Sequence, residues 1–117
     1  MILTDDNKLI IRTYRMIYPF ELSLGKAVQK EVIDQRKMYG YATNYDLYWN
    51  QNCKEFIIFE RRDVEYYPRV LDKDLVMIDI SKSSTFQNHD HDIKLGKNPR
   101  VIITPDGKHA VFVFGDW

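Results

Sequence analysis

Apolar residues along this chain follow two periods, one typical of strands and one typical of a helix. From Lys8 to Tyr18 the sequence KLIIRTYRMIY is rich in β-branched and aromatic residues, and Pro19, which cannot donate a ladder hydrogen bond, follows it. This segment predicts a first strand. Both of its faces carry apolar side chains, so we expect it to lie centrally in a sheet.

The apolar period changes to 3.6 residues at Ser23 and keeps that value as far as Tyr39. Ser23 is of a type that caps a first helical turn, and Gly40 is of the type that follows a last one. The sequence therefore predicts a helix over about 23–39. The apolar side of this helix would carry Leu24, Ala27, Val28, Val32 and Tyr39.

The remainder of the chain predicts strands. Residues 41–50 and 55–60 are apolar runs on either side of an Asn-rich turn, as in a hairpin, and 74–80 reads as a strand with Val76, Ile78 and Ile80 facing inward. Residues 61–68 are polar and end at a proline, whereas 81–100 has no period and predicts a loop. A second hairpin is predicted over 101–114, where Pro105-Asp106-Gly107-Lys108 supplies turn residues.

The Pro-Asp-Gly-Lys turn beside an apolar run is of the kind found in propeller blades. It occurs once, and we expect no internal repeat, so the sequence argues against a propeller. The predicted fold class is α+β: an antiparallel or mixed sheet of five to six strands with the 23–39 helix packed on one face, in two layers. The length of 117 residues predicts a single domain over 1–117.

The amino-acid composition does not change the predicted fold, but it reduces the number of function classes that fit the sequence. Lys plus Arg and Asp plus Glu number 17 each, so only a local patch would attract nucleic acid. The N-terminal residues turn acidic early and no apolar run is long enough to span a bilayer, so we expect no membrane association. A lone Cys53 is typical of a reducing compartment, which favours the cytoplasm. The bias toward Asn, Lys, Ile and Tyr indicates an AT-rich genome, such as that of a low-GC bacterium or its phage.

Aromatic and guanidinium side chains alternate between residues 39 and 69. Such surfaces bind protein partners, in which Tyr and Arg dominate the binding energy, and they also bind nucleotides, small anionic ligands or nucleic acid. The competing interpretation is that half of these aromatics are core residues. The predicted partner-binding residues are Tyr41, Tyr45, Tyr48, Trp49, Arg61, Arg62, Tyr66, Tyr67 and Arg69.

Two further groups could carry chemistry. His89, His91 and Asp92 have a spacing that could hold a divalent metal, although a solvated loop has the same composition. Cys53 could act as a nucleophile with His89, His91 or His109 as base, but nothing in the sequence around it distinguishes it from an incidental thiol. The isolated glycines form neither a P-loop nor a dinucleotide-binding motif.

The segment that ends the sequence is apolar where an unanchored tail would be polar. Phe112, Phe114 and Trp117 would form an apolar edge if they are not buried within one chain, and we therefore expect a homodimer that pairs through this strand.

The leading functional hypothesis is a small non-enzymatic binding protein, such as an inhibitor, an adaptor or a ligand-sequestering protein, with the Tyr/Arg surface as its site and no cofactor. One alternative is a metal-dependent hydrolase or nuclease acting through His89, His91 and Asp92. The other is a nucleic-acid-binding protein that uses a local patch of basic and aromatic residues.

Overall fold

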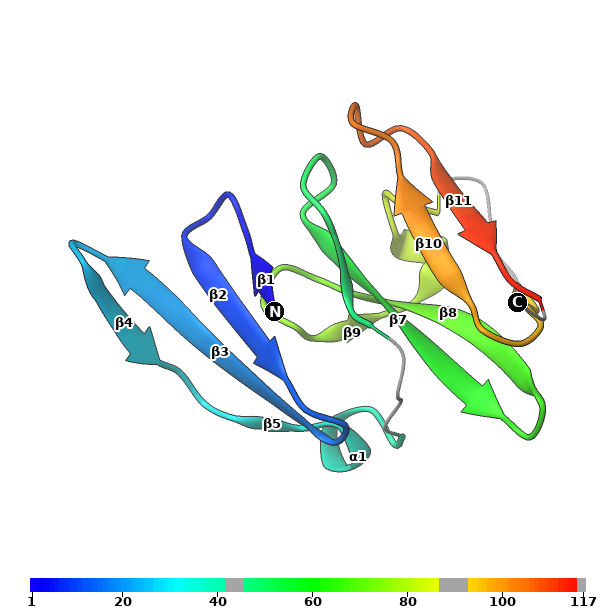
Figure 1. Ribbon diagram of the computed structural model, residues 1–117, viewed down its shortest axis with the longest axis horizontal. Coiled ribbons are helices and arrows are strands. Elements are labelled where there is room, and N and C mark those ends of the chain that lie inside the picture. The colour runs from blue at the N-terminus through cyan, green and yellow to red at the C-terminus, as the bar shows by residue number, and fades with distance from the viewer. Residues whose placement is uncertain (42–45, 87–92, 116–117) are drawn as a thin grey trace. The chain divides into compact units, whose positions relative to one another are not determined.

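The computed structural model describes residues 1–41, 46–86 and 93–115, and the regular secondary structure of these residues is mostly β (Figure 1). Contacts divide the chain into two compact units, Met1–Asn44 and Tyr45–Trp117, which are described separately; the single domain stays a prediction. The elements are β1 (Ile2–Leu3), β2 (Lys8–Arg12), β3 (Met16–Ser23), β4 (Lys26–Gln29), β5 (Ile33–Asp34), α1 (Gln35–Met38), β6 (Tyr48–Asn50), β7 (Glu55–Arg62), β8 (Glu65–Leu71), β9 (Met77–Ile78), a 3-10 turn (Ile80–Lys82), β10 (Arg100–Ile103) and β11 (Ala110–Val113).

The first unit is one antiparallel sheet with strand order β1-β2-β3-β4, in which β5 pairs with β3 beyond the end of β4. The register places Leu9 opposite Phe20 and Ile11 opposite Tyr18. Because side chains alternate along a strand, Ile10 and Ile17 lie on the other face, and both are buried. Figure 1 shows this sheet in blue and cyan.

The predicted helix over 23–39 is wrong, and the two-layer α+β architecture is wrong with it. Residues 23–26 form a tight turn between β3 and β4, in which Leu24 has φ 48° and Gly25 has φ 78°. Positive φ at both central positions belongs to hairpin turns and is incompatible with a right-handed helix. All four residues of β4 are exposed, and of the five residues on the predicted apolar side only Tyr39 is buried.

Helix α1 is a single turn of four residues. Asp34, not Ser23, caps it by accepting a hydrogen bond from the backbone N–H of Arg36. Gly40, with φ 86°, follows the C-terminal Tyr39 and is confirmed as the residue that ends the helix. Val28, Val32 and Ile33 are β-branched and favour extended backbone, which explains why the helix is confined to the last part of the predicted range.

Pro19 lies within a strand instead of ending one, and the segment 8–18 is split between β2 and β3. The carbonyl of Pro19 accepts a hydrogen bond of 2.8 Å from the backbone N–H of Lys30, so the Pro19 nitrogen points to the same side. That side lies between the partner strands β4 and β5, where a donor is not needed. Pro68 occupies a similar position within β8, a strand that the sequence analysis missed.

The second unit contains a four-stranded antiparallel sheet, β6-β7-β8-β9, and the separate hairpin β10–β11. Both hairpins predicted from the sequence are present, as β6–β7 and β10–β11, and residues 42–45 of the first predicted strand lie outside the described residues. Ile78 and Ile80 pack against the core as predicted, whereas Val76 is half exposed and that part of the prediction is wrong. One buried hydrophobic cluster of this unit consists of Ile57, Phe59, Tyr66, Val70, Phe86, Leu95 and Val101.

The chain contains a repeat that we did not expect. A short strand, a turn and an antiparallel partner strand recur as β1–β2, β6–β7 and β10–β11, and the first two of these hairpins continue into sheets of five and four strands. The third strands share the sequence Tyr-Pro-x-x-Leu, at Tyr18–Leu22 and at Tyr67–Leu71. Their separation of roughly 50 residues is the period expected for repeated four-stranded sheets.

Candidate functional site

Five polar side chains lie on one face of the β7–β8 pair. The register places Glu60 opposite Tyr67 and Arg62 opposite Glu65, and Arg69 lies two residues beyond Tyr67 on the same face. The ammonium of Lys94 reaches Glu65 from outside the sheet. We call these six residues the Tyr67 cluster.

Two arginines converge on Glu60 and on the ring of Tyr67. The Oε1 atom of Glu60 accepts from Nη2 of Arg69 at 2.7 Å and from Nε of Arg62 at 3.0 Å. The guanidinium carbons of Arg62 and Arg69 lie 5.3 and 5.4 Å from the centre of the Tyr67 ring, within the range of a cation–π contact. The Tyr67 ring is thus held by two cations that share one carboxylate.

Glu65 connects the other side of the cluster. It accepts from the Tyr67 hydroxyl at 2.6 Å and from Nζ of Lys94 at 2.7 Å. These bonds with Lys94 and Tyr67 lower the pKa of Glu65, because they favour its charged form. The hydrogen bond to Glu65 raises the pKa of Tyr67 and also that of Lys94, so all three groups keep their usual charges at neutral pH.

The cluster is fixed at its centre and open at its rim. The side chains of Arg69 and Glu60 are only 14% and 16% exposed, whereas those of Arg62 and Lys94 are 58% and 65% exposed. Three cations face two carboxylates, which leaves a formal excess of one positive charge. The arrangement therefore presents two positioned cationic groups to solvent beside an aromatic ring.

The structure brings together three of the predicted partner-binding residues, Arg62, Tyr67 and Arg69. Arg61 and Tyr66 are opposite each other on the other face of the same two strands. Arg61 is exposed, and its Nε donates to the carbonyl of Asp63 at 2.8 Å. Tyr66 is buried in the core.

The remaining aromatic residues of that prediction lie elsewhere. Tyr48 and Trp49 are neighbours on β6 and pack on opposite faces of the sheet, Tyr48 edge-on to Phe59 and Trp49 against Phe56 with ring centres 4.5 Å apart. Tyr41 belongs to the first unit, where its ring is 6.4 Å from that of Tyr39. Tyr45 lies outside the described residues.

The sequence analysis missed Glu60, Glu65 and Lys94, although they hold the cluster together. The signal that could have found the two glutamates is the alternation of side chains along β7 and β8. It places Glu60 and Arg62 of β7 on the same face of the sheet as three residues of β8, namely Glu65, Tyr67 and Arg69. The position of Pro68 concealed this alternation, because a proline argues against a strand.

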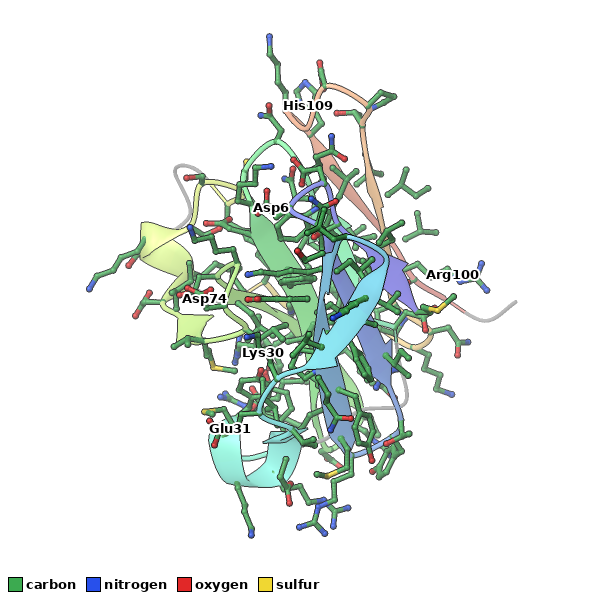
Figure 2. The ribbon with its side chains drawn as sticks, turned by 90° about the vertical axis from the view of Figure 1, so that its left-hand side faces the viewer. Asp6, Lys30, Glu31, Asp74, Arg100 and His109 are labelled. Atoms are coloured by element: carbon green, nitrogen blue, oxygen red, sulfur yellow. The ribbon has the colours of Figure 1, made fainter. Side chains whose placement is uncertain are left out.

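A second feature is an open cavity of about 600 Å³ in the second unit. Its walls come from the β6–β7 turn, the segment after the 3-10 turn and the β10–β11 turn, where Figure 2 shows His109. We call it the loop cavity. It is lined by Asn52, Cys53, Ser84, Thr85, Phe86, Ile93, Gly107, Lys108, His109, Ala110 and Phe112.

Two buried polar residues fix the walls of the loop cavity. Asn50 accepts from the backbone N–H groups of Asn52 and Cys53 at 3.1 and 3.2 Å and donates to the Thr85 hydroxyl at 3.2 Å. Glu55 accepts from the Ser83 hydroxyl and from the backbone N–H groups of the two following residues, at 2.8 to 3.0 Å. Asn50 also donates to the carbonyl of Gly107 in the β10–β11 turn at 3.5 Å, so three loops are held together by side chains that are almost inaccessible to solvent.

Cys53 and His109 line the same cavity, and Cys53 is half-buried. Cavity lining alone does not make a nucleophile and base pair, so Cys53 as a nucleophile stays a prediction. His89, His91 and Asp92 lie outside the described residues, and the metal site stays a prediction as well. Among the residues with described positions, no three His, Cys, Asp or Glu side chains form a group that could hold a metal ion.

Comparison with protein-family models, with curated proteins and with solved structures finds no match to this chain. Within the ranges that the structure describes, no helix has the length and apolar character needed to cross a membrane.

Proposed function

We propose that this chain is a non-enzymatic binding protein that holds an acidic group of a protein partner on the Tyr67 cluster. The observation that carries the proposal is the fixed position of Arg62 and Lys94 at the rim of the cluster, each more than half exposed. Tyr and Arg are also the residue types that dominate the energy of protein interfaces.

Preorganisation is the main physical argument. A long cationic side chain that is immobilised only on binding loses about 0.5–1.5 kcal/mol in conformational entropy. Arg62 is already held by Glu60 and the Tyr67 ring, and Lys94 by Glu65, so much of this cost is met before a partner arrives. A carboxylate that bridges Arg62 and Lys94 would add charge-assisted hydrogen bonds to groups whose geometry is fixed.

The excess positive charge of the cluster selects the partner chemistry. A carboxylate-rich peptide segment matches three cations and two carboxylates better than a basic one, because like charges across an interface are costly. The other hypotheses, a metal-dependent hydrolase and a nucleic-acid binder, stay predictions, as does the cytoplasmic location.

Adjacent arginines on opposite faces give a matched test. Binding of a fluorescent poly-glutamate peptide is measured by anisotropy for the wild type, Arg62→Ala, Lys94→Ala and the control Arg61→Ala, which removes an exposed arginine from the other face. We expect Arg62→Ala and Lys94→Ala each to weaken binding by about tenfold, the effect of losing one charge-assisted contact, and Arg61→Ala to leave it unchanged. Equal effects of all three variants would reject the Tyr67 cluster as the site.

We also propose a second binding function, for a small anionic ligand in the loop cavity. Its volume lies within the range of about 300–1,000 Å³ of small-molecule sites, and it combines an apolar wall of Phe86 and Phe112 with the polar groups of Lys108 and His109. Benzoate, which has a ring for that wall and a carboxylate for the cations, is a suitable probe. Its titration should shift the NMR signals of His109 in the wild type and lose that effect in Lys108→Ala; an unchanged spectrum would eliminate this ligand class.

A further inference from the structure

One face of the first sheet carries seven apolar side chains, of which Leu3, Ile11 and Ala27 are exposed. The register of β1 to β4 places these residues on the same face, and each of them is half-buried or exposed; Leu3 is 66% and Ile11 is 37% exposed. Monomeric proteins rarely expose an apolar area that spans a whole sheet. We call this surface the Leu9 face; it consists of Leu3, Leu9, Ile11, Tyr18, Phe20, Leu22 and Ala27.

The hairpin β10–β11 has a second exposed apolar face. Ile102 and Val111 lie opposite each other and are 59% and 48% exposed, and Val113 continues the face beside them. We call Ile102, Val111 and Val113 the Val111 face. The other side of the hairpin carries Val101 and Phe112, which pack on the core of the second unit.

The contact inside the second unit shows how faces of this repeat pack. There, Tyr48, Ile57 and Phe59 of the β6–β9 sheet pack against Val101, Ile103, Ala110 and Phe112 of the β10–β11 hairpin. The three hairpins can be aligned at the residue pairs that close their turns, because Thr4 pairs with Lys8, Asn50 with Glu55 and Thr104 with His109.

In this alignment, each of the two exposed faces corresponds to one side of the contact between the β6–β9 sheet and the β10–β11 hairpin. Val111 corresponds to Ile57, because each lies two residues beyond the turn-closing residue of its strand, and Ile102 corresponds to Tyr48 in the same way. The Val111 face is therefore the counterpart of the sheet side of the contact.

The Leu9 face corresponds to the hairpin side. Leu9 occupies the position of Ala110, and Ile11 occupies that of Phe112, whereas Leu3 occupies that of Ile103. The Val111 face thus corresponds to the β6–β9 side of the contact inside the second unit, and the Leu9 face corresponds to its β10–β11 side. These two sides already pack on each other within one chain.

We propose that the Val111 face of one copy of this protein packs on the Leu9 face of a second copy, continuing the sheet packing of the repeat from chain to chain. The interface joins two different surfaces, so it is heterologous, and each assembled pair retains one unoccupied face of each kind. The burial of Ile11, Ile102 and Val111 supplies the hydrophobic free energy of association.

The test uses the heterologous character of the interface. Ile11→Asp places a charge on the Leu9 face, Ile102→Asp places one on the Val111 face, and Val64→Asp, at a residue that is 64% exposed outside both faces, is the control. Sedimentation velocity over a wide concentration range should show association for the wild type and for Val64→Asp, and monomers for the two face variants.

Mixing the two face variants decides the proposal. Ile11→Asp retains an intact Val111 face and Ile102→Asp retains an intact Leu9 face, so an equimolar mixture should form a dimer that does not grow further. A wild type that stays monomeric, or a mixture that stays monomeric, would overturn the proposal. Circular dichroism checks that each variant is folded, and Leu3→Asp with Val111→Asp provides a second pair on the same two faces.

Discussion

The backbone of Gly107 lies so close to the side chain of Asn52 that a Cβ atom added at Gly107 would overlap the Asn52 Cβ. This contact joins the β10–β11 turn to the β6–β7 turn at the wall of the loop cavity. Gly107 also has φ 72°, a value that side chains of L-residues disfavour.

Replacement of Gly107 by alanine should therefore destabilise the protein by about 2–4 kcal/mol, since it adds backbone strain and overpacking. Gly25→Ala is the matched control, because Gly25 has a similar φ of 78° but open space around it. We expect Gly25→Ala to cost only about 1–2 kcal/mol, the strain alone. Urea unfolding of both variants gives the comparison, and equal losses would show that Asn52 moves aside freely.

Leu24 has a backbone conformation that leucine disfavours, with φ 48°, and its apolar side chain is fully exposed to solvent. Leu24→Asn should raise the free energy of unfolding by about 0.5–1 kcal/mol, because Asn-Gly is the preferred pair in a hairpin turn of this type. The same change at Leu3, an exposed strand residue, should give no gain. Thermal unfolding distinguishes the two; a destabilised Leu24→Asn would indicate a role for the leucine that the turn geometry does not require.

Asn50 should be the most sensitive polar residue of the second unit. It is 1% exposed and serves three loop segments, so Asn50→Ala leaves several buried groups without a partner and should cost about 2–4 kcal/mol. Asn52→Ala, at an exposed neighbouring residue, should change stability by less than about 0.5 kcal/mol. The measurement is chemical denaturation, and similar values for both variants would contradict the anchoring role of Asn50.

The Tyr67 cluster should make the free energy of unfolding depend on pH in the acid range. The pKa of Glu65 is lowered in the folded protein below the ordinary value of 4.5, so its bonds stabilise the fold fully above that pH. This contribution is lost as the pH falls below 4.5 through the folded pKa. Glu65→Gln should lose less stability than the wild type between neutral pH and the acid range, as measured by urea unfolding at a series of pH values. If the free energies of unfolding of the wild type and of Glu65→Gln change in parallel with pH, Lys94 and Tyr67 do not favour the charged form of the Glu65 carboxylate.

The sequence predicted those elements whose signals are local. The β6–β7 and β10–β11 hairpins are marked by turn residues between apolar runs, and these signals depend on few neighbours. The 23–39 segment failed because its helical period competes with a Leu24-Gly25 turn whose positive φ values the sequence does not reveal. The short β4 pairs with β3, so tertiary hydrogen bonding decided its structure.

The candidate site was predicted in part for a similar reason. Arg62, Tyr67 and Arg69 were recognised by residue type, but their separation from Arg61 and Tyr66 depends on the register of β7 and β8. Register follows from pairing between strands and reverses the face of every side chain when it shifts by one residue. The ion pairs to Glu60 and Glu65 follow from that register, and Pro68 made the strand itself difficult to recognise.

The strand pairing of the described residues also bears on how the protein folds. Within each sheet the named strands pair with their neighbours along the chain, except that β5 pairs with β3. Most backbone hydrogen bonds between strands therefore join residues that are close in sequence. Loop closure then costs little entropy, and folding rates rise as contacts become more local. We therefore expect each hairpin to form early and independently, and we expect the two prolines that lie inside strands, Pro19 and Pro68, to add no break to either sheet.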